Sequence, residues 1–194
     1  MSHPPAPMPA TRNTLAALAA AGALTTPATH AFEGWDWTLE SGYLWGLRNN
    51  TVSDYEVAPT LFTLRGPSTW EIGGWVVRPR FSALAAAFTE GPESYYFGLA
   101  AAPSIERQLT TLPATLFVSV GGGIGLTDSS GGQDGLGHDF TLNWFAQAGI
   151  RHRLTETLDW QASVFFLHLS NGGRTTPNPA VDALGVTLGI TRRF

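Results

Sequence analysis

A histidine and a serine stand two residues apart at the end of a segment that alternates between apolar and polar residues. In residues 157–170 the even positions are largely apolar and end with His168 and Ser170. Because the side chains of a strand repeat every two residues, these two side chains would point to the same side. An imidazole beside a hydroxyl can take its proton, which activates a serine for attack on an ester carbonyl and so permits acyl transfer.

Further residues could complete this chemistry. Asp182 begins the next alternating segment, and a carboxylate on the second ring nitrogen of His168 would fix the tautomer and stabilise the imidazolium. Asn171 and the backbone N–H groups of the Gly172-Gly173 turn follow Ser170 directly, and they could donate hydrogen bonds to a developing oxyanion. The spacing alone leaves a second interpretation open, because a single histidine near a strand end often supports a loop or lies at an interface.

The composition limits the classes of protein that can carry such residues. The chain has 194 residues, a formal charge of −4 and no cysteine. It therefore has the length of one domain, offers no broad basic surface to nucleic acid, and holds neither disulfides nor thiolate metal ligands. Charged residues make up 13% of the sequence, against 22 glycines and 7 tryptophans, which favours β structure at an interface over a typical cytosolic enzyme.

The N-terminal segment has the pattern of a secretory signal peptide. Arg12 precedes an apolar stretch over residues 15–24, which is well short of the ~20 residues that a membrane-spanning helix requires. Small residues up to Ala31 match the site that a signal peptidase reads. We therefore expect residues 1–31 to be removed and residues 32–194 to form the mature domain. A buried amphipathic helix is the weaker alternative, since the alanine-rich stretch has no polar face.

The rest of the chain predicts an all-β fold, because alternating segments separated by turn residues follow one another without helical periodicity. The predicted strands are residues 35–47, 55–65, 69–78, 94–104, 114–126, 139–152, 157–170 and 182–194. Between them, short or moderate turns alternate with longer loops at residues 48–54, 79–93, 127–138 and 171–181. An even number of strands with this alternation predicts an eight-stranded antiparallel transmembrane β-barrel of the outer membrane.

The faces of the predicted strands agree with a barrel in a membrane. In the last strand the even positions are apolar and the odd positions are small or weakly polar, as a narrow interior requires. Tryptophans and tyrosines near strand ends fit the two interfacial girdles, and the chain ends in the aromatic residue Phe194. A soluble lipocalin-like barrel would carry charges outside, and the strands carry few. In this topology His168, Ser170 and Asp182 meet on the lipid-facing surface, where polar groups are costly.

The C-terminal region resembles a known family. The run from Phe166 to Gly173, followed by residues 177–179 (Pro-Asn-Pro) and Asp182, is similar to the C-terminal signature of the lipid A 3-O-deacylases. These are eight-stranded outer-membrane acyl hydrolases of Gram-negative bacteria. The resemblance covers about the last 30 residues by motif, and the remainder by strand number, topology and signal peptide.

The resemblance implies a role for each residue of the motif. It implies Ser170 as the nucleophile, His168 as the base and Asp182 as the acid that orients the base. It also implies that Asn171 belongs to the oxyanion hole, which the Gly173 turn would complete. The family has a glutamate at the position of Asp182. The shorter aspartate arm requires a backbone shift or a looser hydrogen bond to the histidine.

The implied substrate is lipid A, or the lipopolysaccharide that contains it, hydrolysed at the ester-linked acyl chain of the 3-position. Arg174, in the loop beside the site, is the candidate for binding its phosphates. The other arginines near predicted loops, Arg48, Arg78 and Arg80, are interpreted as solvated loop residues. The mechanism requires no metal and no cofactor.

Other functions remain open at this stage. One is a non-catalytic small barrel, either structural or a narrow pore, in which Asp182 marks the decay of a site. Another is an outer-membrane phospholipase, which the signature does not exclude. A homodimer is left open as well.

Overall fold

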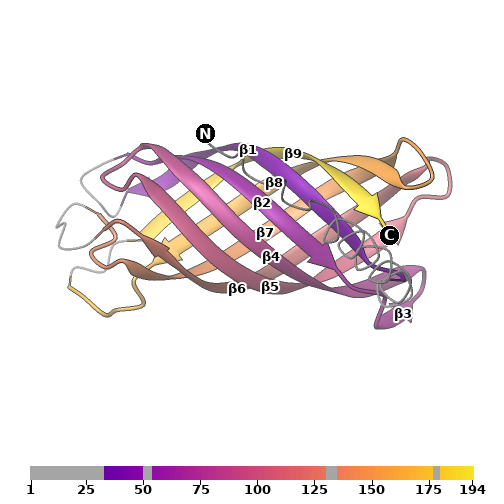
Figure 1. Cartoon of the computed structure of the whole chain (residues 1–194), viewed down its shortest axis with the longest axis horizontal. Helices are drawn as coiled ribbons and strands as arrows, with labels where there is room; N and C mark the ends of the chain where they lie inside the picture. Colours follow the sequence, from indigo (N-terminus) through magenta and orange to yellow (C-terminus); the bar gives the residue numbers. More distant parts are fainter. Residues whose placement is uncertain (1–32, 50–53, 130–134, 177–179) are drawn as a thin grey trace, which may run out of the picture. The chain divides into compact units, whose positions relative to one another are not determined.

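Eight long antiparallel strands close into a barrel, as the sequence predicts (Figure 1). The structure is a computed structural model that describes residues 33–49, 54–129, 135–176 and 180–194, so the predicted signal peptide lies outside the described residues. The strands are β1 (Asp36–Asn49), β2 (Glu56–Arg65), β3 (Trp70–Ile72), β4 (Trp75–Glu90), β5 (Tyr95–Gln108), β6 (Ala114–Thr127), β7 (Phe140–Arg153), β8 (Leu158–Ser170) and β9 (Ala180–Arg193). The short β3 pairs only with β4, and the pairings β1–β9 and β2–β4 complete the barrel. None of the described residues belongs to a helix that is long and apolar enough to cross a membrane.

The third strand of the barrel differs from the predicted one. The prediction of a strand at residues 69–78 and a long loop at 79–93 is wrong, because β4 continues from Trp75 to Glu90 and the connection to β5 is only residues 91–94. The predicted loop begins at Pro79, and proline lacks the N–H that a ladder needs and is rare inside central strands. In the structure Pro79 lies opposite Pro103 of β5, and the β4–β5 ladder continues on both sides. The β5–β6 ladder instead lacks pairs at residues 102 and 103.

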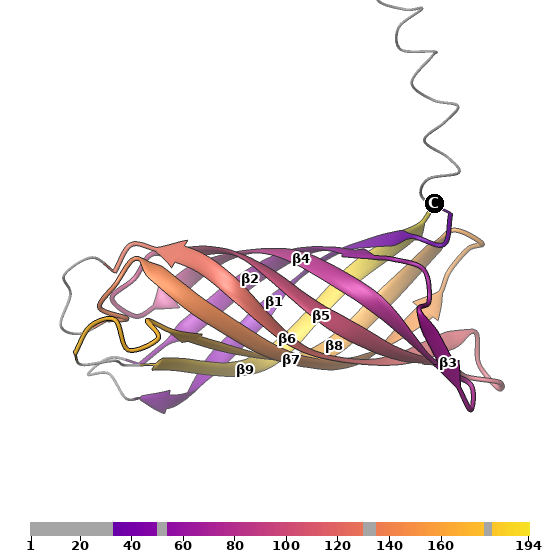
Figure 2. The same cartoon turned by 90° about the horizontal axis from the view of Figure 1, so that it is seen from below.

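The two ends of the barrel carry different connections (Figures 1 and 2). We call the end with the β4–β5, β6–β7 and β8–β9 connections the loop end. The other end, which we call the C-terminal end, carries β3, the connections 109–113 and 154–157, and Phe194. β8 runs toward the loop end and β9 returns from it, so Ser170 and the start of β9 lie together at the loop end.

Polar side chains meet in the middle of the barrel. Gln147 and Gln161 both donate to the Glu40 carboxylate, at 2.8 and 2.9 Å. Arg80 donates to the Gln147 side-chain oxygen and lies 3.7 Å from Glu40. These residues come from β1, β4, β7 and β8, so their hydrogen bonds join strands that are not neighbours and cross the lumen.

Apolar side chains cover most of the outside of the barrel. The exposed large apolar residues alternate with buried positions along the strands; examples are Leu39, Phe62, Leu99, Ile124, Val164 and Leu188. Inside the loop end, however, buried apolar residues from several strands and connections form a cluster that we call the apolar core: Leu44, Tyr55, Val57, Tyr96, Leu136, Phe145, Phe165, Leu167, Leu169, Val181 and Ala183, with neighbours. A polar middle and an apolar exterior fit a barrel surrounded by lipid.

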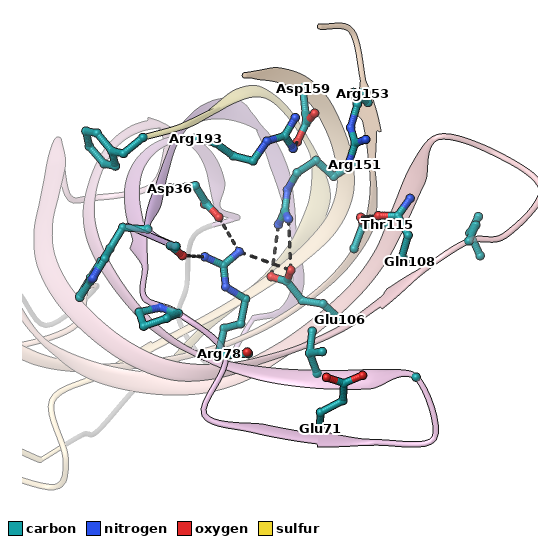
Figure 3. Close-up of a pocket in the computed structure, with 18 of the residues that line it drawn as sticks. Asp36, Glu71, Arg78, Glu106, Gln108, Thr115, Arg151, Arg153, Asp159 and Arg193 are labelled. Atoms are coloured by element: carbon teal, nitrogen blue, oxygen red, sulfur yellow. Dashed lines mark hydrogen bonds and ion pairs between the residues drawn. The ribbon is translucent and has the colours of Figure 1, made fainter. Parts of the chain in front are cut away.

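The C-terminal end of the lumen holds an arginine and carboxylate cluster around a cavity of about 790 Å³ (Figure 3). Arg65 lies 2.5 Å from Asp36, and Arg151 lies 3.3 Å from Glu106. Figure 3 shows Arg78 and Arg151 converging on Glu106. The charges in this cavity are therefore bound largely to one another.

Two arginines interpreted from the sequence as solvated loop residues belong to this interior. Arg78 and Arg80 lie in β4, where Arg78 pairs with Asp36 at 2.5 Å and Arg80 is 2% exposed. The interpretation is wrong because it depended on the predicted loop at residues 79–93. The side chain of Arg48 lies outside the described residues.

Candidate active site

Strand β8 presents two kinds of side chain at the loop end. On its inner side, Leu167 and Leu169 are fully buried in the apolar core. On its outer side, His168 and Ser170 are partly exposed beside Phe166. The tight packing of the two leucines fixes the backbone that carries the two polar residues, since a slip by one residue would move every side chain to the opposite face.

His168 and Asp182 are hydrogen-bonded across the β8–β9 ladder. They are direct partners in its register, and the His168 Nδ1 to Asp182 Oδ1 distance is 2.6 Å. Their side chains are 22% and 16% exposed, so both groups are largely screened from the surroundings. Because Nδ1 faces the carboxylate, Nε2 is the ring nitrogen that remains for another partner.

The short arm of Asp182 does not weaken this contact. The β8–β9 ladder is regular from Leu158 to Ser170, so the carboxylate reaches the imidazole without an irregularity between the two strands. The irregularity lies on the other side of β9, where the β1–β9 register shifts between Gly46 and Arg48. The hydrogen bond to His168 is therefore short, and the backbone irregularity next to Asp182 lies between β9 and β1.

Trp144 of β7 supports the imidazole ring. It is the register partner of His168 on β7, and the two ring centroids are 5.6 Å apart. Phe166 packs against the same indole at 4.8 Å. The sequence analysis did not single out Trp144, although it lies on the outward-facing positions of β7 and the β7–β8 pairing brings it to the histidine.

Ser170 lies on the same outward face as His168. Two residues on one strand face are separated by about 7 Å between their Cα atoms, so side-chain rotation decides whether their polar atoms meet. Among the described residues the Ser170 hydroxyl forms no hydrogen bond, to His168 or to any other group. Thus His168 and Asp182 are hydrogen-bonded to each other, and Ser170 lies beside them on the same face of the barrel.

The two predicted oxyanion donors, Asn171 and Gly173, are bound to each other. The Gly173 N–H donates to Asn171 Oδ1 at 2.8 Å. The Asn171 amide nitrogen donates to the Leu136 carbonyl at 3.0 Å and to Thr175 Oγ1 at 2.7 Å. Asn171 is fully buried, and both of its amide hydrogens are used in holding the turn. In this arrangement the Asn171 side chain supports the site from inside and does not point at Ser170.

Arg174 lies beside the same turn. Its Nη1 donates to the Asn171 carbonyl at 3.2 Å, and its guanidinium carbon lies 4.5 Å from the centre of the Phe140 ring. The residue is exposed, so most of its N–H groups face outward from these two contacts. It is the one sequence-predicted binding residue that the structure describes at the site.

No group of three or more histidine, cysteine or acidic side chains with metal-binding geometry occurs in the part of the chain that the structure describes. The cavity at the C-terminal end lies at the opposite end of the barrel from His168 and Ser170.

Comparison with known proteins identifies the family of the chain and structures with a similar fold. The sequence model of the family described as "Lipid A 3-O-deacylase (PagL)" matches residues 27–191. The structure is similar to the crystal structure of the outer membrane enzyme PagL, with a TM-score of 0.60 and 15% sequence identity over 82% of this chain and 99% of that chain. Neisserial surface protein A (NspA) is also similar, with a TM-score of 0.60 and 10% identity over 84% of this chain and 98% of that one. No curated protein sequence matches significantly.

Proposed function

Because the chain belongs to the lipid A 3-O-deacylase family, we propose that it hydrolyses the 3-position acyl ester of lipid A with Ser170, His168 and Asp182. Family membership supports the reaction class, and the hydrogen bond between His168 and Asp182 is the observation that carries the assignment of residues. A bonded imidazole and carboxylate next to an outward serine have the order that nucleophilic ester hydrolysis requires.

The proposed reaction has two halves. The Ser170 hydroxyl oxygen attacks the acyl carbonyl while His168 Nε2 takes its proton, and Asp182 stabilises the resulting imidazolium. The imidazolium then gives that proton to the sugar oxygen, which leaves as a hydroxyl and creates an acyl-enzyme. In the second half a water molecule attacks the acyl carbonyl with His168 as base, releasing the fatty acid and restoring Ser170.

The oxyanion in this reaction would be stabilised by backbone groups. The side chain of Asn171 and the N–H of Gly173 are engaged with each other, so we assign both a supporting role in this arrangement. The backbone N–H of Gly172 remains as a candidate donor. A side chain at this position would be crowded, because a Cβ would lie 2.9 Å from the side chain of Leu142, the register partner of Ser170.

The position of the site suits a lipid substrate. The chain is an outer-membrane β-barrel, so its apolar exterior faces lipid and the substrate can approach from the side. Below the site, an apolar depression of about 770 Å³ on the outer faces of β6 to β9 is lined by Val164, Ala162, Ala148 and Val186, with neighbours. Val164 is six residues from Ser170, about 20 Å along the strand, so the end of a long acyl chain whose ester lies at Ser170 would reach the near edge of this depression.

The head group of the substrate would lie above this depression, at the loop end. We propose that Arg174 binds a lipid A phosphate there, because a guanidinium can form two parallel hydrogen bonds to phosphate oxygens. Its contact with Phe140 holds the guanidinium near the turn and leaves the remaining donors outward. A homodimer gains no support from the comparisons and stays a prediction.

The competing functions are less well supported. A narrow pore would need an open lumen, whereas the bonds among Glu40, Gln147, Gln161 and Arg80 cross it and the apolar core lies above them. A phospholipase would use the same three residues, so only the choice of substrate separates it from the proposed enzyme.

The test is mass spectrometry of lipid A and phospholipids from cells that express the wild-type chain or Ser170→Ala. The expected result is the loss of one hydroxyacyl group from lipid A with the wild type alone, while both proteins show the heat-dependent gel mobility of an assembled barrel. Cleavage by assembled Ser170→Ala would overturn the role of the serine. Cleavage of phospholipid in place of lipid A would establish the alternative substrate.

A further inference from the structure

We propose that Glu93 positions the turn that follows Ser170 by holding Leu136 in place. Glu93 lies in the connection between β4 and β5, far from β8 in the sequence and at the same end of the barrel. The inference rests on the proposed function, because it assigns a role in the reaction to a residue that would not touch the substrate.

Glu93 is a buried carboxylate that accepts hydrogen bonds from three surrounding residues. The residue is 3% exposed. One carboxylate oxygen accepts a hydrogen bond from the Tyr55 hydroxyl at 2.6 Å, and the other accepts from Ser129 Oγ at 2.6 Å and from the Leu136 N–H. A buried carboxylate is costly unless its oxygens are satisfied, and here three donors from two other connections converge on it. This convergence ties three connections of the loop end together.

Two glycines allow the close approach to this carboxylate. A Cβ at Gly135 would lie 2.2 Å from a Glu93 oxygen and 2.9 Å from Ser129 Oγ. At Gly91 the backbone has a φ of +127°, and a Cβ would lie 2.6 Å from the Tyr55 ring. Larger residues at either position would push the connections apart, so the contact of Leu136 with Glu93 depends on glycine.

Leu136 transmits the position of Glu93 to the active-site strand. Its N–H binds the Glu93 carboxylate, and its carbonyl accepts the hydrogen bond from Asn171 at 3.0 Å. Gly137 repeats this arrangement, because its N–H donates to Ser129 Oγ at 2.8 Å and its carbonyl accepts from Thr175 Oγ1 at 3.3 Å. Two successive residues thus bind the Glu93 site on one side and the turn after Ser170 on the other.

The consequence for the reaction follows from the place of Asn171, which is bonded covalently to Ser170. Holding Asn171 holds the carbonyl of Ser170 and the first residues of the turn that would supply the oxyanion donor. A displacement of about 1 Å at such a position can slow an enzyme about a hundredfold without changing the chemistry. Glu93 is therefore a positioning residue, and its loss should lower kcat more than it alters KM.

The state of Tyr55 agrees with this role. Burial, together with its hydrogen bond to Glu93, raises the pKa of Tyr55 far above its ordinary value of 10. The phenol therefore remains a neutral donor to the carboxylate at any pH at which the barrel would work. The ring also packs against Phe88 at 5.6 Å, which fixes the direction of the hydroxyl.

The experiment compares Glu93→Ala, Glu93→Gln and a matched control, Glu106→Ala, all as full-length assembled barrels. Glu106 is also a buried carboxylate, but it lies in the arginine cluster at the C-terminal end. We expect Glu93→Ala to lower kcat for lipid A in micelles at least about tenfold with KM changed less than about threefold. Glu93→Gln should recover most of the rate, because its amide oxygen can accept from Leu136 and its NH₂ can donate to Tyr55. Glu106→Ala should lower stability and leave kcat unchanged.

A second readout keeps the inference separate from the proposed function. Amide hydrogen exchange over residues 168–176 should become at least about tenfold faster in Glu93→Ala, and not in Glu106→Ala, whether or not the protein cleaves lipid A. Unchanged exchange, or an equal loss of kcat in both alanine variants, would overturn the positioning role. A wild-type chain that leaves lipid A intact while Glu93→Ala still accelerates this exchange would overturn the proposed function and keep the structural role of Glu93.

Discussion

His168 and Asp182 are cross-strand partners, so a carboxylate one methylene shorter than the family's glutamate still reaches the imidazole at 2.6 Å. Their contact depends on the register of β8 and β9, which the buried leucines of β8 hold from the inside. We therefore expect the charge at position 182 and its place in the ladder to matter more than whether the acid is aspartate or glutamate.

The role of the charge at position 182 can be tested directly. Asp182→Asn keeps the shape of the side chain but cannot stabilise an imidazolium and favours the wrong tautomer of His168, so kcat should fall about 10²- to 10⁴-fold. Deacylation assays on the purified, assembled barrel would measure this. Asp182→Glu is the control and should stay within about tenfold of the wild type. Equal activity of Asp182→Asn and the wild type would contradict the assignment.

Asn171 should matter although it faces inward. Asn171→Ala removes the hydrogen bonds to Leu136, Thr175 and Gly173 together, so the turn after Ser170 loses its inner support. We expect kcat to fall about 10- to 100-fold, as for other displacements of reacting groups. Asn143→Ala is a matched control, because Asn143 is also buried and donates to Tyr96 at 2.7 Å. A similar loss of rate in both variants would indicate general loosening of the loop end.

The polar middle of the lumen should stabilise the barrel and prevent conduction. Gln147→Ala removes hydrogen bonds to Glu40, Ser163 and Arg80, which leaves buried charged groups unsatisfied. The free energy of unfolding in urea should fall by about 1–3 kcal/mol. Gln108→Ala, at the exposed mouth, should change it little. The wild-type barrel should show no ion conductance in planar bilayers, and steady single-channel currents would contradict a closed lumen.

Acid should weaken one contact of the loop end. Burial acts to raise the pKa of Asp128, but hydrogen bonds from the backbone N–H groups of Ser94 and Tyr95 outweigh it and lower the pKa below its ordinary value of 3.8. A depressed pKa means that this stabilisation is present above pH 3.8 and is lost as the pH falls through the lowered value. The difference in melting temperature between the wild type and Asp128→Asn should therefore shrink below pH 3.8. A difference that stays constant from pH 5 to pH 2 would contradict it.

The sequence predicts the barrel well because alternation is a local property that every strand displays by itself. It also places His168, Ser170 and Asp182 on one outward face, since that placement needs only the period of a strand and the β8–β9 pairing. The predicted strand ended too early, at the residue before Pro79, which in the structure lies opposite Pro103 of β5, 24 residues along the chain.

Other features of the site were beyond a local interpretation. The Asn171 side chain donates a hydrogen bond to Leu136, which lies in another connection. The Leu136 N–H in turn donates to Glu93, which lies in a third connection. No periodicity relates these residues, because they meet only after the barrel has closed. For Glu93 the sequence shows only that it follows Gly91-Pro92, which indicates a turn; its burial is seen only in the structure.

The outward position of His168 and Ser170 has a consequence for how such an enzyme would meet its substrate. A lipid that reaches the site by sliding along the leaflet samples two dimensions and never has to leave its neighbours. The frequency of encounters between lipid and site would then depend on the fluidity and the packing of the surrounding leaflet, and would require no conformational opening of the protein. Tightly packed lipid would therefore slow turnover and loosely packed lipid would speed it, with no change in the structure of the barrel.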